Sequence, residues 1–452
     1  MIAPAHSSVP TERRATAPSN TPVRGSRAYG RALRLFTYLL FTTYVLTFLN
    51  MWIWGDVRSE DPLGVGARTP LIQYSVWLFT PLLAFLVAQR TSLAEILRPL
   101  APYAPFVAFG LLSGVASLGR ADFVRPMTFF VVGALGIVLF VRVLGLESLK
   151  TALFWTLLSS LVVSIVLCVF FPAENVRADL RTASGAVWVG VFWQKNSLGI
   201  QAAWALVMLL FWGDMGRKRL LLLAAVGLVC LQGADSAGSL VAVVGAFLSV
   251  TLVAFIRTRR WTRGLKTLSF ALGVLAAIVC AANLAPVLLG LIGRDTNLTG
   301  RADIWPVFFE RAMQRPLLGW GPGTFTFPSY ATSDLVAHFE YIGNISSPHN
   351  MYIAALGDGG IVCLLGYALP LFHLAFVVPF REPGSLGLHS AAVGTMVILH
   401  GFSESSLVFG FNLNWLMTIL MFVALDDQRR QRQDGARREV SRATRRAGGS
   451  GG

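Results

Sequence analysis

The chain has 452 residues, of which 54% are hydrophobic and 13% are charged, and its formal net charge is +15. Because charged residues make up about 25% of an ordinary soluble domain, this composition excludes a soluble globular enzyme. A bilayer core about 30 Å thick needs roughly 20 apolar residues for each helix that crosses it. The sequence therefore predicts an all-α polytopic membrane protein.

Twelve stretches of the chain are apolar and are long enough, or nearly long enough, to cross a membrane. We therefore expect about 12 transmembrane helices, with one large extracytoplasmic loop between the ninth and the tenth. The sixth, seventh and eleventh stretches are the shortest. In chain order the stretches are Leu35–Trp54, Leu71–Ala88, Leu100–Leu118, Pro126–Leu144, Thr151–Phe171, Leu198–Trp212, Leu220–Leu231, Ala237–Ile256, Thr267–Leu291, Ile361–Phe380, His389–Phe402 and Phe409–Leu425.

The placement of Lys and Arg tests this count, because these residues gather in the short cytoplasmic loops of membrane proteins. With both termini in the cytoplasm, the inner segments, including Arg142, hold 27 of the 38 Lys and Arg residues and 9 acids. The outer segments hold 11 Lys and Arg residues and 14 acids. The inner face then carries +18 and the outer face −3, so the charges favour this topology.

The two ends of the chain are basic, and neither has apolar periodicity. We expect residues 1–34 and 426–452 to be disordered cytoplasmic tails that face anionic lipid, with the transmembrane domain at 35–425. Topology accounts for the net charge, so nucleic-acid binding is not expected, and residues 1–34 are too long and polar for a cleavable signal. Neither a disulfide nor a Cys-based metal site is expected, because every cysteine lies in an apolar span: Cys168, Cys230, Cys280 and Cys363.

The large outer loop, residues 292–350, contains most of the chain's distinctive polar sequence. Asp303 is the predicted cap of an amphipathic helix over about Ile304–Gln314, which we expect to lie on the membrane surface. Its apolar face consists of Ile304, Phe308 and Ala312. Pro316 ends this helix, and three closely spaced glycines allow a tight backbone path: Gly319, Gly321 and Gly323.

His349 stands at the predicted start of the next helix, with Ser347 as N-cap and Pro348 as the first helical residue. The positive end of a helix disfavours imidazolium, so the ring should stay neutral and able to accept a proton. A general base needs this property. The simpler alternative is that His349 only hydrogen-bonds within the loop, but its place at the end of the large outer loop favours the base.

Cationic residues on the outer face are disfavoured unless they have a task. Guanidinium groups bind phosphate bidentately, and a cluster could stabilise a diphosphate leaving group without a metal. The alternative is that each pairs with a nearby acid, as Arg120 and Arg125 could with Asp122, or extends to the membrane interface. The candidates are Arg120, Arg125, Arg177, Arg181, Lys195 and Arg301.

Two further outer segments carry candidate residues. Lys195 and Asn196 precede the sixth span, where Asn196 could serve as N-cap and Lys195 could reach the same phosphate. Glu404 is the only acid in its loop. It could orient a base, bind sugar hydroxyls or cap a helix, whereas Asp235 is more simply a turn residue.

Five motifs surround the outer loop in a fixed order, and together they resemble the O-antigen ligase and polymerase superfamily of membrane glycosyltransferases. The resemblance covers mainly residues 192–366 and is strongest to the exopolysaccharide polymerase-like branch. The motifs are FWQKNSLG at Phe192–Gly199, GADSAGSL at Gly233–Leu240, GRADIW at Gly300–Trp305, RPLLGWGPGTF at Arg315–Phe325 and SPHNMYIAALGDGGI at Ser347–Ile361.

The resemblance implies a substrate, a reaction and a location. The donor would be an undecaprenyl-diphosphate-linked glycan, and the acceptor a hydroxyl of a glycan, lipid or protein. Transfer or polymerisation would take place at the outer face of the bacterial cytoplasmic (inner) membrane, in contact with membrane lipid. Neither a metal, a nucleotide sugar nor any other cofactor would be needed.

The resemblance also implies roles for individual residues. His349 matches the histidine that activates the acceptor, Arg301 matches an arginine that holds the diphosphate, and Lys195–Asn196 match a Lys-Asn element of the polymerase-like members. One turn departs from the family, because Asp235 and Ser236 stand where Ser-Arg is usual. The missing charge would have to come from elsewhere, with Arg120 and Arg125 as candidates.

The expected reaction is an inverting displacement at the anomeric carbon, with one base and one group of cations. A retaining reaction would need a second carboxylate, for which Glu404 and Asp358 are available. The rival class is a twelve-span transporter or flippase for a lipid-linked glycan. Its long loop would usually lie midway along the chain, and ionisable residues within spans reduce here to His373 and His400. A third possibility is a scaffold without catalysis, in which substitution of His349 would have no effect.

Overall fold

The computed structural model describes eleven segments of the chain, and they are mostly helical. These segments are residues 82–84, 91–117, 124–179, 185–192, 194–211, 215–276, 301–325, 329–338, 347–382, 384–403 and 412–448.

The described helices follow one another with short connections. The first half of the chain contains α3 (Leu93–Leu97), the 3₁₀-helix η3 (Arg98–Tyr103), α4 (Ala104–Ala116), α5 (Val124–Leu144), α6 (Leu146–Phe170), α7 (Pro172–Asn175), α8 (Lys195–Met208) and α9 (Arg217–Ala234). The second half contains α10 (Ala237–Arg257), a helix over 263–276, α12 (Arg301–Met313), α13 (Ser333–His338), α14 (Met351–Phe372), α15 (Val378–Arg381), α16 (Ser385–Gly401) and α17 (Leu413–Gly448).

The fold is helical but not wholly so, because two short strands follow α7. Strands β1 (Val176–Ala178) and β2 (Ala186–Trp188) pair antiparallel, with Arg177 opposite Val187. The expectation of an all-α chain is wrong at this hairpin. Its two strands lie in the outer loop before α8, where no long apolar run imposes a helix.

Four of the described helical stretches are long and apolar enough to cross a membrane, and the chain is a multi-pass membrane protein. They are Leu93–Ala116, Leu146–Phe170, Ala237–Arg257 and Met351–Arg381, and Phe130–Leu144 is a shorter apolar helix. The number of 12 spans stays a prediction. The first two predicted spans lie outside the described residues, apart from residues 82–84.

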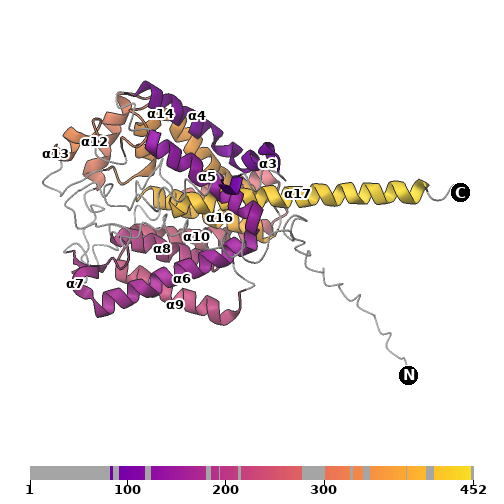
Figure 1. Ribbon diagram of the computed structural model, residues 1–452, viewed down its shortest axis with the longest axis horizontal. Helices are drawn as coiled ribbons and strands as arrows, with labels where there is room; N and C mark the ends of the chain where they lie inside the picture. Colours follow the sequence, from indigo (N-terminus) through magenta and orange to yellow (C-terminus); the bar gives the residue numbers. More distant parts are fainter. Residues whose placement is uncertain are drawn as a thin grey trace.

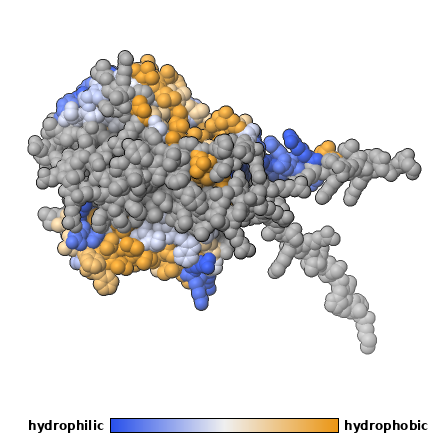
Figure 2. Space-filling model, in the orientation of Figure 1, coloured by the Kyte–Doolittle hydropathy of each residue, from blue (hydrophilic) through white to orange (hydrophobic). Residues whose placement is uncertain are grey.

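The helices lie side by side with their axes along the longest dimension of the molecule (Figure 1). Helices α7, α12 and α13 lie at one end, and the C-terminal part of α17 extends from the opposite end. On the face seen in Figure 2, hydrophobic residues gather along the flanks and hydrophilic residues lie toward the two ends. This distribution fits a bundle whose flanks face lipid.

The core between α4, α5, α14 and α17 is built from aromatic rings. The Trp415 ring lies 4.6 Å from Phe130, 4.9 Å from Tyr103 and 5.4 Å from Tyr367, measured between ring centroids. Phe106 joins the cluster 5.1 Å from Phe130. Such edge-to-face pairs add specific geometry to apolar burial, so they fix how these four helices pack.

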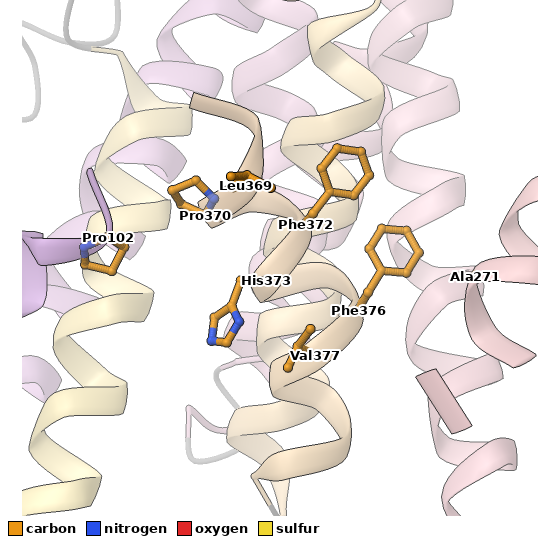
Figure 3. A pocket seen from close by; sticks show the side chains of 8 residues that line it. All are labelled: Pro102, Ala271, Leu369, Pro370, Phe372, His373, Phe376 and Val377. Carbon is orange, nitrogen blue, oxygen red and sulfur yellow. The ribbon is translucent and has the colours of Figure 1, made fainter. Parts of the chain in front are cut away.

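Helix α14 begins earlier and is less regular than the predicted span Ile361–Phe380. It is broken at Gly359 and Gly360, and beyond Pro370 it widens into the π-helical segment His373–Val377, shown in Figure 3. Pro370 has no N–H to donate within a helix, which favours such a local change of pitch.

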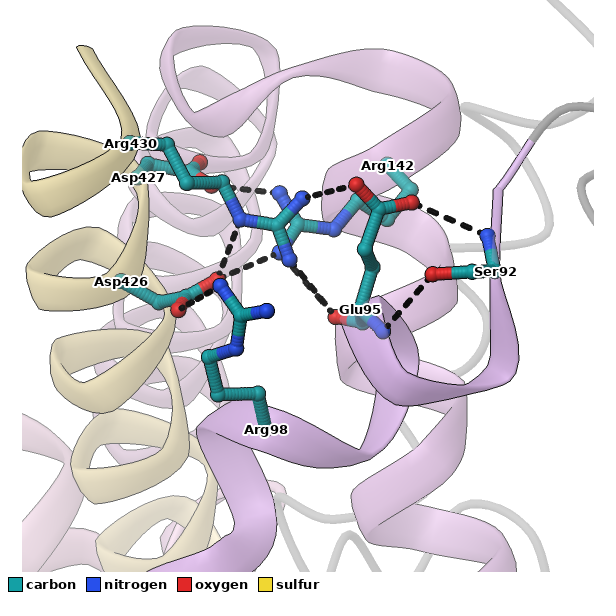
Figure 4. A network of polar contacts seen from close by, with 7 residues as sticks. All are labelled: Ser92, Glu95, Arg98, Arg142, Asp426, Asp427 and Arg430. Atoms are coloured by element: carbon teal, nitrogen blue, oxygen red, sulfur yellow. Dashed lines mark hydrogen bonds and ion pairs between the residues drawn. The ribbon is translucent and has the colours of Figure 1, made fainter. Parts of the chain in front are cut away.

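Helix α17 continues well past the last predicted span, and the expected disordered tail is helical up to Gly448. A group of charged residues, which we call the α17 ion cluster, holds it at Asp426 and Asp427 (Figure 4). Arg142 of α5 binds both aspartates, and Arg430 binds Asp426 at 2.8 Å and Glu95 at 2.9 Å. Arg and Gln are also good helix formers, and an Asp–Arg pair four residues apart supports a helix. Residues 1–34, the other predicted tail, lie outside the described residues.

Candidate active site

His349 lies immediately before α14 rather than within its first turn. The N-cap is Asn350, whose side-chain oxygen accepts from the backbone N–H of Tyr352 at 2.9 Å and of Ile353 at 3.1 Å. The predicted cap at Ser347 is therefore wrong by three positions. His349 is half-buried and has a left-handed backbone with φ of 46°. A residue other than glycine adopts this conformation only where its surroundings impose it.

A hydrogen bond connects the His349 segment to α12. The indole Nε1 of Trp305 donates to the backbone carbonyl of Pro348 at 3.0 Å. Arg301 is the first residue of α12 and stands four positions before Trp305, one helical turn away. The structure therefore brings the turn of α12 that starts with Arg301 against the residue next to His349. Asp303, the predicted cap, lies in this first turn.

The predicted apolar face of α12 is confirmed. Ile304, Phe308 and Ala312 are all buried, and the Phe308 ring packs 6.0 Å from that of Phe325. This face is directed into the protein, where α12 packs against α14. The amphipathic pattern therefore reflects packing on α14, and a position on the membrane surface stays a prediction.

The glycine-rich turn after α12 docks into the break in α14. The backbone N–H of Trp320 donates to the Gly357 carbonyl at 2.7 Å, and the N–H of Ile361 donates to the Pro316 carbonyl at 2.7 Å. Because α14 is interrupted at Gly359 and Gly360, its free backbone groups pair with the turn instead. The loop and α14 are thus joined backbone to backbone.

Glycine is required at this junction for steric reasons. Gly360 has φ of 72°, and a Cβ atom there would fall on the carbonyl oxygen of Leu317. A Cβ atom on Gly319 would approach the Gly357 carbonyl oxygen to 2.5 Å. The backbones can therefore meet only if both positions lack a side chain.

Asp358 stabilises the same junction. Its side chain is 0% exposed, and its Oδ1 accepts from the backbone N–H of Phe325 at 2.7 Å. Its carbonyl accepts from the Ser113 hydroxyl at 2.7 Å, which connects the junction to α4. This carboxylate therefore holds the turn, and it is poorly placed to act as the second carboxylate of a retaining reaction.

Lys195 and Asn196 lie in the first turn of α8, beside the turn between α9 and α10. The Lys195 ammonium forms an ion pair with Asp179 at 2.7 Å, and the carboxylate of Asp179 is nearly buried. Asn196 is the second residue of α8, where Gln194 occupies the cap position, and its Oδ1 accepts from the Ser236 hydroxyl at 3.2 Å. The two sequence motifs that contain these residues thus meet in space.

Close packing connects this region to α14. A Cβ atom on Gly199 would lie 2.6 Å from the Ser236 Cβ atom, and a side chain on Gly238 would overlap Ser403 at the end of α16. One turn before Ser403, the carbonyl of Ile398 accepts from the Tyr352 hydroxyl at 3.0 Å. Tyr352 follows His349 by three residues. The Lys195 and His349 regions are therefore supported by the same end of α16.

The comparisons with known proteins agree with this arrangement. Residues 220–368 match the O-antigen ligase family model. The exopolysaccharide production protein ExoQ of Rhizobium meliloti (strain 1021) is 27% identical over 264 residues, which are 54% of this chain and 60% of that protein. The resemblance to the O-antigen ligase superfamily is confirmed.

The O-antigen ligase match begins within α9 and ends within α14. It therefore contains Arg301, Trp305, His349 and the docked glycine turn, and it leaves Lys195–Asn196 outside. The aligned part covers less than two thirds of ExoQ, so the complete activity is treated below as a proposal.

Several predicted site residues fall where the structure gives no side chain. Arg120 and Glu404 lie outside the described residues, and so does Arg181. Arg125 and Arg301 are placed in the backbone of α5 and α12, but their side chains are not described. The roles of these residues remain predictions.

The sequence interpretation missed two structural features near the site. Trp305 lies within the GRADIW motif, so its spacing from Arg301 was a usable signal. Asn414, a polar residue in an apolar span, accepts from the Trp204 indole at 2.8 Å and contacts His400 Nδ1 at 3.2 Å. Polar residues within a span commonly hydrogen-bond between helices, and His400 therefore contributes to the packing of α8, α16 and α17.

Metal binding was considered at the same sites. Within the described segments, no group of three or more His, Cys, Asp and Glu side chains is placed to hold a metal ion. Cys168, Cys230 and Cys363 are buried and free.

Proposed function

We propose that this protein is a membrane glycosyltransferase of the O-antigen ligase and polymerase type. It would transfer or polymerise a glycan from an undecaprenyl-diphosphate-linked donor to an acceptor hydroxyl, without a metal, at the outer face of the bacterial cytoplasmic membrane. The single observation that carries this proposal is the Trp305–Pro348 hydrogen bond. It brings two motifs 43 residues apart into one site, with one supplying a base and the other a cation.

His349 is the proposed general base. Its ring would take the proton of the acceptor hydroxyl while the acceptor oxygen forms a bond to the anomeric carbon of the donor. The bond from that carbon to the diphosphate oxygen breaks in the same step, and the electron pair leaves with the lipid diphosphate. A single displacement inverts the configuration of the anomeric carbon. The burial of Asp358 in the turn supports this choice over a retaining reaction.

Arg301 is the proposed principal contact to the departing diphosphate. Its place at the start of α12, where backbone N–H groups are free, adds the positive end of a helix to the guanidinium charge. Arg120 and Arg125 are candidates to supply the charge that the family has at the turn now occupied by Asp235. Glu404 is a candidate to bind sugar hydroxyls or to orient the base.

Lys195 has a different status from the other cations, because it already pairs with Asp179. To bind a phosphate, its ammonium would have to exchange this partner or share it. Asn196 is proposed to orient Ser236 and the turn beside the donor. The alternative of a transporter or flippase is not favoured by the comparisons, which match a ligase and an exopolysaccharide production protein.

The decisive experiment replaces His349 with Ala or Gln in the full chain, purified in detergent with a lipid-diphosphate glycan and EDTA. The rate of the transfer step should fall by about 10²-fold to 10⁴-fold, while donor binding changes little. His389→Gln is a matched control, because this histidine packs against Phe211, remote from the outer loop. Transfer that survives in both His349 variants would reject the base, and wild-type transfer that stops in EDTA would reject a metal-free reaction.

A parallel variant tests the cation. Arg301→Lys keeps the positive charge but loses the bidentate geometry, so both transfer and donor binding should weaken at normal protein levels. Wild-type transfer in Arg301→Lys and in Arg301→Ala would show that the diphosphate binds elsewhere.

A further inference from the structure

An open apolar groove lies on the outer side of α14 where the helix changes pitch (Figure 3). Its volume is about 590 Å³, and its walls include Phe372 and Phe376 of α14, Pro102 of η3 and Ala271 of the helix over 263–276. Leu369 and Phe372, which also line it, are 60% and 44% exposed. Large apolar side chains exposed on the flank of a membrane protein face lipid.

One polar side chain stands in this apolar wall. His373 is the only ionisable residue among the eight that line the groove, and it opens the π-helical segment. Short π-helical segments recur at functional sites because they displace side chains from the regular helical positions. Here the segment turns His373 toward Pro102, away from Phe372 and Phe376 (Figure 3).

Two arginines lie near one end of the groove. Arg381 ends α15, eight residues beyond His373 or about 12 Å along a helix. Arg429 belongs to α17, and the positive charges of both arginines act on the His373 ring. Within the described part of the chain, neither arginine forms an ion pair or a side-chain hydrogen bond.

The neighbouring arginines differ, because each already has a carboxylate. Arg432 binds Glu382 at 2.8 Å, and Arg430 belongs to the α17 ion cluster. The nearby acids are therefore engaged, and Arg381 and Arg429 remain available for an anion from outside the protein. A pair of available cations beside an apolar groove has the complementarity of an amphiphile with an anionic head.

We propose that this groove binds an anionic phospholipid, with an acyl chain along Phe372 and Phe376 and the phosphate between Arg381 and Arg429. The His373 ring lies between the two parts, where it can donate a hydrogen bond to an ester or phosphate oxygen. A free phosphate would gain only the contact with two exposed arginines, which water and salt weaken. The phospholipid adds the burial of its chain and is concentrated in the membrane. The site is independent of the proposed transferase activity.

Lipid retention by the purified full chain tests the proposal. The protein is exchanged into detergent, phosphatidylglycerol or phosphatidylcholine with the same acyl chains is added, and bound lipid is measured by native mass spectrometry. Phosphatidylglycerol should bind in preference to phosphatidylcholine. The double variant Arg381→Gln/Arg429→Gln should bind it about 30-fold more weakly. The matched control Arg260→Gln/Arg263→Gln removes two exposed charges from the loop after α10 and should bind as the wild type does.

A second variant tests the groove without changing any charge. Ala271→Trp fills the groove and should reduce binding of phosphatidylglycerol, and Ala271→Leu replaces it if the Trp variant does not elute as one species in gel filtration. Equal binding of the two lipids would overturn the proposal, as would equal losses in the two double variants. Unchanged binding in the groove variant, or displacement of phosphatidylglycerol by millimolar inorganic phosphate, would assign the arginines to a free anion instead.

Discussion

Replacement of Trp305 by Phe tests how the site is assembled. The change removes one hydrogen-bond donor and keeps most of the aromatic surface. The lost bond is the 3.0 Å contact from the indole to the Pro348 carbonyl, which is partly buried. A bond of this kind contributes about 1 kcal/mol to the free energy of unfolding, so the protein should fold and reach the membrane normally.

The effect on transfer should be larger than the effect on stability. His349 follows Pro348 directly, and its left-handed backbone depends on the surroundings that hold it. Without the bond, the His349 segment can shift relative to Arg301, and a displacement of about 1 Å can cost about 10²-fold in rate. We expect kcat for glycan transfer to fall by about 10-fold to 10²-fold, with a smaller change in KM. Trp305 would thus be a positioning residue.

The control is Trp320→Phe, because Trp320 makes the same type of bond elsewhere in the loop. Its indole donates to the Arg311 carbonyl, also at 3.0 Å. Both variants should lose similar stability in thermal unfolding, but only Trp305→Phe should lose the additional activity. In the double variant with His349→Ala, Trp305→Phe should add little further loss. Equal effects of the two tryptophans on kcat, or wild-type kcat in Trp305→Phe, would refute the positioning role.

Three other predictions concern the fold. Gly360→Ala should lower the free energy of unfolding by at least about 2 kcal/mol, from a left-handed backbone and a clash at the docked turn, whereas an unchanged melting temperature would show that the junction can relax. Asp426→Asn, which leaves the α17 ion cluster with uncompensated arginines, should cost about 3 kcal/mol, and Glu147→Gln at an exposed pair should cost less than about 1 kcal/mol. Comparable melting temperatures for these two variants would contradict the importance of the cluster. In a chain without its four native cysteines, Ser333→Cys should react with a membrane-impermeant thiol reagent in intact cells and Ser441→Cys should not; the reverse pattern would invert the topology.

The sequence by itself determined the class of the protein and the position of most described helices. The length of an apolar run is a local property, and it predicts a span wherever backbone groups must be satisfied without water. The period of Ile304, Phe308 and Ala312 likewise predicted the buried face of α12. The motifs predicted the superfamily, because they are read without knowing what they touch.

Only the tertiary structure decided which of these features act together. The Trp305–Pro348 bond, the docking of the glycine turn on α14 and the pairing of Lys195 with Asp179 join residues that lie 16 to 43 positions apart. The α17 ion cluster joins residues more than 280 positions apart, and it kept helical a segment that composition alone assigned to disorder. Composition and periodicity describe one helix at a time. Which helices meet is set by the packing of side chains from different segments, and no single segment contains that information.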